Sequence, residues 1–326
     1  MLTRPNLFFL LSNTKLEHPL PAIDSAPWGL RKILTFAEYS IRSDSTIKDW
    51  YMQKFKATET TGLATLCCAQ TGNINLENWL FVTPTSLAPT NDNLIMHDTG
   101  DITGYESKQL LSVLRDHLFD EFDSLITIKP NLWALKTKEH QDLLTVDHKK
   151  AVNGSIADHV MKGEDSKKWR RLTSEIEILF SQHNINHQRE KERKLPINSI
   201  WIWGTGRLPK IKNSNTLISS DRRLACNLAK ISQARILNPE ITLETIGLKD
   251  SPENIIIELN SSLSIENKWN MSFNDNWVLP AHSMLKQRKI QNISLIIENN
   301  CNILQLDLNQ MSQWKIWRYI YPPNLI

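Results

Sequence analysis

The sequence predicts an α/β protein in which a mixed central sheet is flanked by helices. Short apolar runs, which are typical of strands, alternate with amphipathic helical patterns along the whole chain. The chain has 326 residues, enough for one large domain or for two domains with cores of their own. Its 40% apolar and 22% charged residues and its mean hydropathy of -0.35 are ordinary for a globular protein.

Charge, apolar runs and cysteine usage narrow the classes of partner. The net charge of +3 is too small to favour a nucleic-acid partner, because binding through counterion release needs a clustered basic surface. No apolar stretch has the length of a bilayer span, so we expect no membrane partner. The four cysteines have no CxxC spacing and form no dense framework, which favours reduced thiols and a cytoplasmic location.

The first expected elements are a strand, two helices and two strands, at residues 6–11, 29–42, 45–55, 78–84 and 93–98. The opening run "NLFFLL" is too short for a signal-peptide core and no cleavage pattern follows it, so it predicts a buried strand. Apolar side chains at helical spacing from Leu30 to Ile41 predict the first helix. Ser45 or Thr46 is expected to cap the second helix.

The middle of the chain predicts a helix at residues 106–122, a strand hairpin at 125–136 and a polar connection at 152–168. A leucine stripe indicates the helix, and a Lys-Pro-Asn turn indicates the hairpin. We place a domain boundary here, between residues 1–125 and residues 126–326, although a single domain fits the same pattern.

The clearest helix is expected at residues 165–182, where an apolar stripe begins with Trp169. Its first turns carry four cations, Lys167, Lys168, Arg170 and Arg171. Cations at a helix N-terminus oppose the helix dipole. This cluster is therefore either a solvated face or a group held in place to meet an anion.

The last expected elements are a strand at residues 199–203, a helix that begins at Asp221, a strand at 253–259, a helix followed by a hairpin that turns at 298–300, and a short helix at 312–320. The strand at 199–203 has bulky side chains on both faces, which predicts a central place in a sheet.

The segment "NSIWIWGTGRLP", residues 198–209, is the main functional motif. The two glycines after its strand permit a positive φ and allow backbone N–H groups to approach an anion closely. The spacing matches neither the dinucleotide fingerprint GxGxxG nor the P-loop. A tight structural turn and a phosphate-binding corner both remain open as interpretations.

This motif belongs to a longer block at residues 169–209 that contains Trp169, Arg170, Asn186, Arg189, Asn198, Trp201, Trp203, Gly204 and Gly206. The block resembles the signature W-R-R-L…H-x-x-N-x-x-R…N-S-L-W-x-W-G-x-G-x-L-P of bacterial RpfE-type regulatory proteins, also labelled cofactor-independent phosphoglycerate mutase-like proteins. Residues 79–98 and 276–297 resemble further segments of that family. The resemblance covers most of the chain thinly and the block strongly.

Part of the block is also similar to archaeal-type phosphoglycerate mutases of the alkaline phosphatase superfamily. The resemblance implies a degenerate alkaline-phosphatase-like scaffold and, in active members, phosphoryl transfer through a Ser or Thr nucleophile beside two metal ions. This chain departs from that pattern in two places. Its first strand is followed by "SNTKLEHP" in place of an Asp-Gly metal motif, and none of its three Asp-His dipeptides is followed by Ser or Thr.

The candidate ligand site predicted from these residues consists of Asn186, Arg189, Asn198, Trp203, Gly204, Gly206 and Arg170. Arg189 would bind an anion through two parallel hydrogen bonds, the asparagines would orient it, and the glycine backbone would donate N–H groups. The set His140, Asp142, Asp147 and His148 could hold a metal ion, but solvated residues in a polar connection are the favoured interpretation. We therefore predict no metal and no cofactor.

These observations predict a non-catalytic protein of the RpfE-type or phosphoglycerate mutase-like family. It would bind a small phosphorylated or anionic ligand, or a protein partner, in a regulatory role. The aromatic and cationic C-terminal segment at 312–326 suits a protein interface, but a terminal helix docked on its own domain is the favoured interpretation. The alternative is an active, metal-dependent phosphoglycerate mutase that requires Mn, Zn or Mg.

Overall fold

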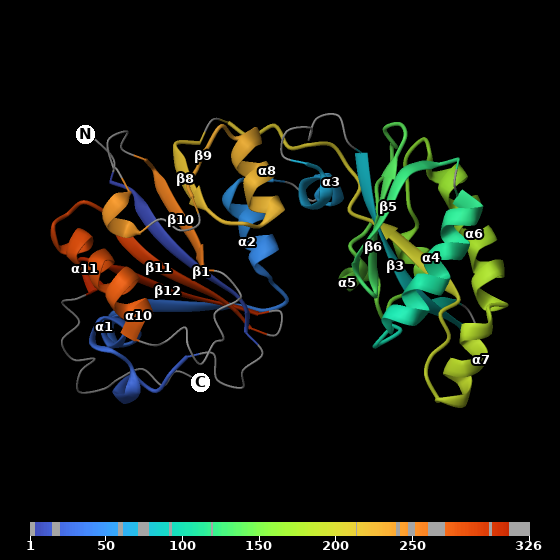
Figure 1. Ribbon diagram of the computed structural model, residues 1–326, viewed down its shortest axis with the longest axis horizontal. Coiled ribbons are helices and arrows are strands. Elements are labelled where there is room, and N and C mark those ends of the chain that lie inside the picture. Colours follow the sequence, from blue (N-terminus) through green and yellow to red (C-terminus); the bar gives the residue numbers. More distant parts are fainter. Residues whose placement is uncertain are drawn as a thin grey trace. The chain divides into compact units, whose positions relative to one another are not determined.

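The computed structural model describes residues 4–14, 20–57, 61–70, 78–90, 93–118, 120–212, 214–238, 242–246, 252–259, 271–299 and 302–312. The chain divides into two compact units (Figure 1). Residues 1–57 and 210–326 form the first unit, and residues 58–209 form the inserted unit. Each has a sheet flanked by helices, so the predicted α/β class with a mixed sheet is confirmed.

The units divide the chain differently from the expected boundary at residue 125, which lies inside a strand of the inserted unit. The reason is long-range pairing: one long strand before that position bonds to two strands after it. Sequence composition does not reveal such pairing. No helix among the described residues combines the length and apolarity that a membrane crossing needs.

The first unit is built on a seven-stranded sheet in the order β2-β12-β11-β1-β10-β8-β9. Its strands are β1 (Asn6–Thr14), β2 (Glu38–Arg42), β8 (Thr216–Ser219), β9 (Arg235–Ile236), β10 (Asn254–Leu259), β11 (Asn292–Asn299) and β12 (Asn302–Asn309). β1 runs parallel to β10 and β11, whereas β12 is antiparallel to β11 and β2. The predicted opening strand, the strand at 253–259 and the late hairpin are confirmed.

Helices cover both faces of this sheet. They are η1 (Ile23–Ser25), α1 (Trp28–Phe36), α2 (Ile47–Lys54), α8 (Arg223–Ile231), η4 (Leu243–Thr245), α10 (Met271–Phe273), η5 (Asn274–Val278) and α11 (Leu279–Lys286). In Figure 1, α1, α10 and α11 gather on one side and α2 and α8 on the other. β1 alternates accordingly: Leu7 and Phe9 pack in the core with α1, whereas Phe8 packs on Trp50 of α2.

The structure corrects or refines three helix predictions for the first unit, and a fourth falls almost wholly on residues that it does not describe. The helix expected at 29–42 ends at Phe36, and its second half forms β2, because this segment pairs with β12 some 260 residues later. The cap of α2 is Thr46, which forms a reciprocal capping box with Asp49. The N-cap of α8 is Arg222, not Asp221. The helix expected at 312–320 lies outside the described residues except for Ser312.

The inserted unit contains an antiparallel sheet in the order β4-β3-β6-β5, with β7 paired to β3. Its elements are α3 (Leu63–Cys68), β3 (Asn78–Pro89), β4 (Leu94–His97), α4 (Gly104–Leu118), β5 (Phe122–Lys129), β6 (Leu132–Thr137), α5 (His148–Ala151), η3 (Ile156–His159), α6 (Ser166–Ser181), α7 (Asn184–Lys191) and β7 (Ser199–Trp203). α4 and α6 lie on one side of the sheet in Figure 1. They bury Leu114, Trp169 and Ile176 against Trp133 of β6.

Two predictions for this unit are corrected. The helix expected at 106–122 ends at Leu118, and Phe122 opens β5. β7 was expected in the centre of a sheet, but among the described strands it pairs with β3 alone. Its isoleucines are buried in the core, whereas Trp201 and Trp203 on the opposite face are only half-buried. Bulky residues on both faces therefore do not require a paired strand on both sides.

Candidate functional site

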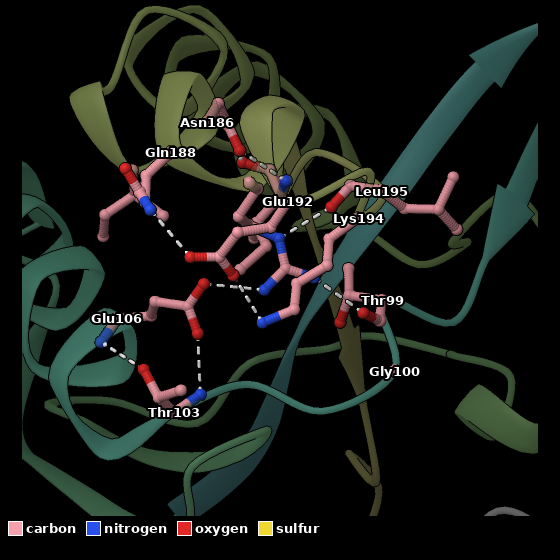
Figure 2. Close-up of polar contacts among 12 residues, drawn as sticks. Thr99, Gly100, Thr103, Glu106, Asn186, Gln188, Glu192, Lys194 and Leu195 are labelled. Carbon is pink, nitrogen blue, oxygen red and sulfur yellow. Dashed lines mark hydrogen bonds and ion pairs between the residues drawn. The ribbon is translucent and has the colours of Figure 1, made fainter.

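Arg189 is the most deeply buried of the predicted site residues, with 1% of its surface exposed. Its hydrogen-bond partners, labelled in Figure 2, are Glu106 of α4, Thr99 in the chain that precedes α4, and Leu195 after α7. Nη1 donates to Glu106 Oε1 at 2.8 Å and Nη2 donates to the Thr99 carbonyl at 2.7 Å. Nε donates to the Leu195 carbonyl at 2.7 Å. Each nitrogen of the guanidinium thus donates to a partner inside the protein, and burial keeps the side chain from solvent.

Glu106, the carboxylate partner of Arg189, is fixed by the start of α4. The Thr103 backbone N donates to Glu106 Oε2 at 2.7 Å, and the Glu106 backbone N donates to Thr103 Oγ1 at 3.2 Å, which makes a capping box. Burial raises the pKa of Glu106, but the hydrogen bonds from Thr103 and Arg189 outweigh it, so the pKa is lowered. The pair therefore stays ionised at neutral pH and holds α4 to α7.

Asn186 and Asn198 bond to the backbone on either side of the start of β7. Asn186 Nδ2 donates to the carbonyls of Phe180 and Ile197 at 2.7 and 3.0 Å, and its Oδ1 accepts from Ile197 N at 2.7 Å. Asn198 Oδ1 accepts from Leu87 N at 2.7 Å, and its Nδ2 donates to the Leu87 carbonyl at 2.8 Å. These amides extend the strand pairing of β7 and tie it to α6 and β3.

The segment after β7 makes a close corner with α3. Trp203 Nε1 donates to Thr83 Oγ1 at 2.9 Å. Gly204 has a φ of 72°, and its carbonyl accepts from Ala64 N at 2.9 Å. A Cβ at Gly204 would lie 2.8 Å from the Phe81 ring. The carbonyl oxygen of Gly206 packs closely on Gly62, and a Cβ added at Gly62 would lie 2.5 Å from that oxygen. Packing and turn geometry require these glycines.

Arg170 lies apart from this network and lines a cavity of about 190 Å³ that none of the other six predicted residues lines. Its Nε donates to the Ser166 carbonyl at 3.3 Å, and no described residue accepts a hydrogen bond from its two Nη atoms. The cavity lies along α6, η3 and β7, and its lining is largely apolar, with Ile156, Val160 and Trp201 among its members. Arg170 is an exposed residue, so water solvates a cation that borders this largely apolar space.

Glu177 also lines this cavity, about two turns along α6 from Arg170. Its Oε1 accepts from Ser199 Oγ at 2.9 Å. Burial raises the pKa of Glu177, and the Ser199 hydrogen bond offsets only part of this effect. The sequence prediction missed Glu177. The signal was available, because Arg170, Thr173 and Glu177 follow helical spacing on a second, polar face of α6.

The possible metal ligands do not come together. Asp147 caps α5 by accepting from Lys149 N at 3.0 Å, and His140 contacts Asn78. Burial lowers the pKa of His148, against the opposing effect of Asp98 and Asp147. In the described ranges, no three or more His, Cys, Asp or Glu residues are grouped so that they could hold a metal ion. The described residues therefore do not fit a two-metal centre.

Comparison with known proteins gives a partial relationship. No protein-family model matches the chain. It is 27% identical over 129 residues to a probable 2,3-bisphosphoglycerate-independent phosphoglycerate mutase of Geobacter sulfurreducens, a match that covers 39% of this chain and 32% of that protein. It is 30% identical over 137 residues to a 2,3-bisphosphoglycerate-independent phosphoglycerate mutase of Methanosarcina acetivorans. This match covers 38% of this chain and 34% of that protein.

The chain thus spans about a third of the length of the curated relatives that it matches. Among solved structures, the cofactor-independent phosphoglycerate mutase from Thermoplasma acidophilum aligns with a TM-score of 0.43 at 10% identity, covering 96% of this chain and 95% of the enzyme. The resemblance predicted from the sequence is confirmed in this coarse form: the chain is partially homologous to cofactor-independent phosphoglycerate mutases.

Proposed function

We propose that the chain is a phosphoglycerate mutase-like protein that binds a small anionic ligand in a regulatory role and performs no phosphoryl transfer. The ligand occupies the cavity along α6, η3 and β7. The observation that carries this proposal is that Arg170, a predicted site residue, lines the cavity with Nη atoms that no described residue uses. The proposal places the ligand at Arg170 and gives Arg189 a structural role.

The lining of the cavity supports an amphipathic ligand. A carboxylate or phosphate group would accept two parallel hydrogen bonds from the Arg170 guanidinium. The apolar body of the ligand would lie against Val160 and Trp201. Glu177 lies further along α6 in the same lining and accepts a hydrogen bond from Ser199. Such a site favours an anion with an apolar body over a compact, fully polar anion.

The non-catalytic part of the proposal is supported by the positions of the shared motif residues. Arg189, Asn186 and Asn198 direct their polar atoms to backbone and side-chain partners within the inserted unit. These structural hydrogen bonds account for the motif residues without a part in catalysis. The likeness to phosphoglycerate mutases then reflects a shared scaffold.

Isothermal titration of the full chain with 3-phenylpropionate and with acetate, which has the same carboxylate but no apolar body, tests this function. We expect 3-phenylpropionate to bind more tightly, and Arg170→Ala to weaken its binding at least ten-fold. Arg171→Ala is the matched control, because Arg171 is the next residue on α6, is 73% exposed and pairs with Glu175. Equal effects of the two substitutions, or no binding by the natural chain, would contradict the proposal.

The alternative is catalysis of the interconversion of 2- and 3-phosphoglycerate, which the partial homology favours. A coupled assay with Mn, Zn and Mg added in turn tests it. Turnover above that of buffer with any one metal would establish the enzyme and overturn the non-catalytic proposal. Ligand binding at Arg170 is measured separately and does not depend on this outcome.

A further inference from the structure

The first unit has a polar pocket of about 570 Å³ at the end of its sheet where β1 and β11 begin. The residues that line it are Asn6, Phe8, Arg42, Trp50, Gln53, Lys54, Asn292, Ser294, Gln305 and Asp307. β1 and β11 are parallel and in register here, with Phe8 opposite Ser294. β12 is antiparallel and brings Asp307 opposite Ser294. Alternate residues of three strands therefore form one wall, and α2 forms the other.

Lys54 of α2 is half-buried in this pocket. Its Nζ lies 4.0 Å from the centroid of the Phe8 ring. Burial lowers the pKa of Lys54, and Asp307 and Glu253 offset part of this effect. No carboxylate of a described residue forms a salt bridge with Lys54. The ammonium group therefore bears a desolvation cost that a bound anion would offset.

The second cation of the pocket, Arg42 of β2, has neutral partners. Its Nη1 donates to Gln53 Oε1, and its Nη2 donates to Gln305 Oε1 at 2.9 Å. The carboxylate of Asp307 is engaged by other groups: Oδ1 accepts from Ser294 Oγ at 2.5 Å and Oδ2 accepts from Gln305 Nε2 at 2.8 Å. The pocket thus contains two cations that form no salt bridge with a described carboxylate. Its one carboxylate, Asp307, already accepts two hydrogen bonds and offsets only part of the effect of burial on Lys54.

We propose that this pocket binds a small phosphate monoester that carries hydroxyl groups. The phosphate group lies between Lys54 and Arg42, and the amides of Asn6 and Gln53 bind the hydroxyl groups. Two cations from different elements fit one doubly charged group, whereas a nucleic acid backbone would need a longer basic surface. This site is independent of the cavity in the inserted unit, because it lies entirely in the first unit.

Isothermal titration of the full chain with glycerol 3-phosphate, inorganic phosphate and glycerol at low ionic strength tests the proposal. We expect glycerol 3-phosphate to bind more tightly than phosphate, and glycerol to give no measurable heat. Lys54→Gln and Arg42→Gln should each weaken glycerol 3-phosphate binding at least ten-fold. Lys48→Gln is the control, because Lys48 is on α2 outside the pocket and pairs with Asp49. It should change the affinity less than two-fold.

Three results would overturn the proposal: no binding of glycerol 3-phosphate by the natural chain, binding of inorganic phosphate with the same affinity, or an equal loss of affinity in Lys48→Gln. Circular dichroism shows whether each variant is folded. If Lys54→Gln fails to fold, Arg42→Gln decides the question, because Arg42 is on the edge strand β2, where its loss removes hydrogen bonds to neutral partners only.

Discussion

Substitution of Arg189 should destabilise the inserted unit more than any change at a surface arginine. Arg189→Met removes the cation that pairs with Glu106 and the donors to the Thr99 and Leu195 carbonyls. Breaking a buried ion pair by removing one partner costs about 3–5 kcal/mol, because the other charge is left buried without compensation. Native proteins have a free energy of unfolding of about 5–15 kcal/mol, so this loss is a large fraction of the total.

Urea unfolding followed by circular dichroism measures the effect. Arg171→Ala, at an exposed position on α6, should change the free energy of unfolding by less than about 0.5 kcal/mol. The double variant with Glu106→Gln should lose less than the sum of the two single variants by about 1 kcal/mol or more, because the two residues are in direct contact. A loss for Arg189→Met no larger than that for Arg171→Ala would refute the structural role of this residue.

The same pair predicts a dependence on pH. The folded-state pKa of Glu106 is lowered from 4.5, so the folded state favours the ionised carboxylate. Its contribution to stability is complete above pH 4.5 and is lost as the pH falls through the lower folded-state pKa. The difference in unfolding free energy between the natural chain and Glu106→Gln should therefore shrink as the pH falls below 4.5. A difference that is constant with pH would contradict this.

Three further substitutions test other parts of the structure. Gly204→Ala should cost about 1–3 kcal/mol in urea unfolding, because φ is positive and the added Cβ has no room; Gly104→Ala, where nothing lies within 4 Å, is its control and should cost less. Glu177→Gln should stabilise the chain near pH 7 and have little effect below pH 4, because the raised folded-state pKa makes ionisation of this carboxyl unfavourable to folding. A change in unfolding free energy that is independent of pH would contradict this expectation. Tyr51→Phe should cost about 1.5 kcal/mol in unfolding free energy, since the Tyr51 hydroxyl donates to the buried Glu258 carboxylate at 3.1 Å, and no change would argue against that hydrogen bond.

The elements that the sequence predicts best are those whose pattern is local. β1 and β10 are apolar on both faces, and α6 has an unbroken apolar stripe, so each was placed correctly. β2 was predicted as the end of a helix, because its strand character comes from pairing with β12 far along the chain. The edge position of β7 depends in the same way on which strands reach it.

The candidate site shows the same limit at the level of side chains. The sequence singled out Arg189, but its partners Glu106 and Thr99 lie 83 and 90 residues away, and only the fold brings them together. A buried structural arginine and a ligand-binding arginine have the same local sequence signal. Glu106 itself was accessible to prediction, because Thr103 and Glu106 have the spacing of a capping box.

An NMR titration of the full chain with 3-phenylpropionate, which follows the Nε–Hε signals of the arginine side chains, tests most directly where the ligand binds. We expect the Arg170 signal to shift with ligand concentration, together with backbone amides of residues 199–202, while the Arg189 signal stays in place. A shift of the Arg189 signal with no change at Arg170 would show that the anion binds at the Arg189–Glu106 pair. It would contradict a ligand-binding role for Arg170 and a structural role for Arg189.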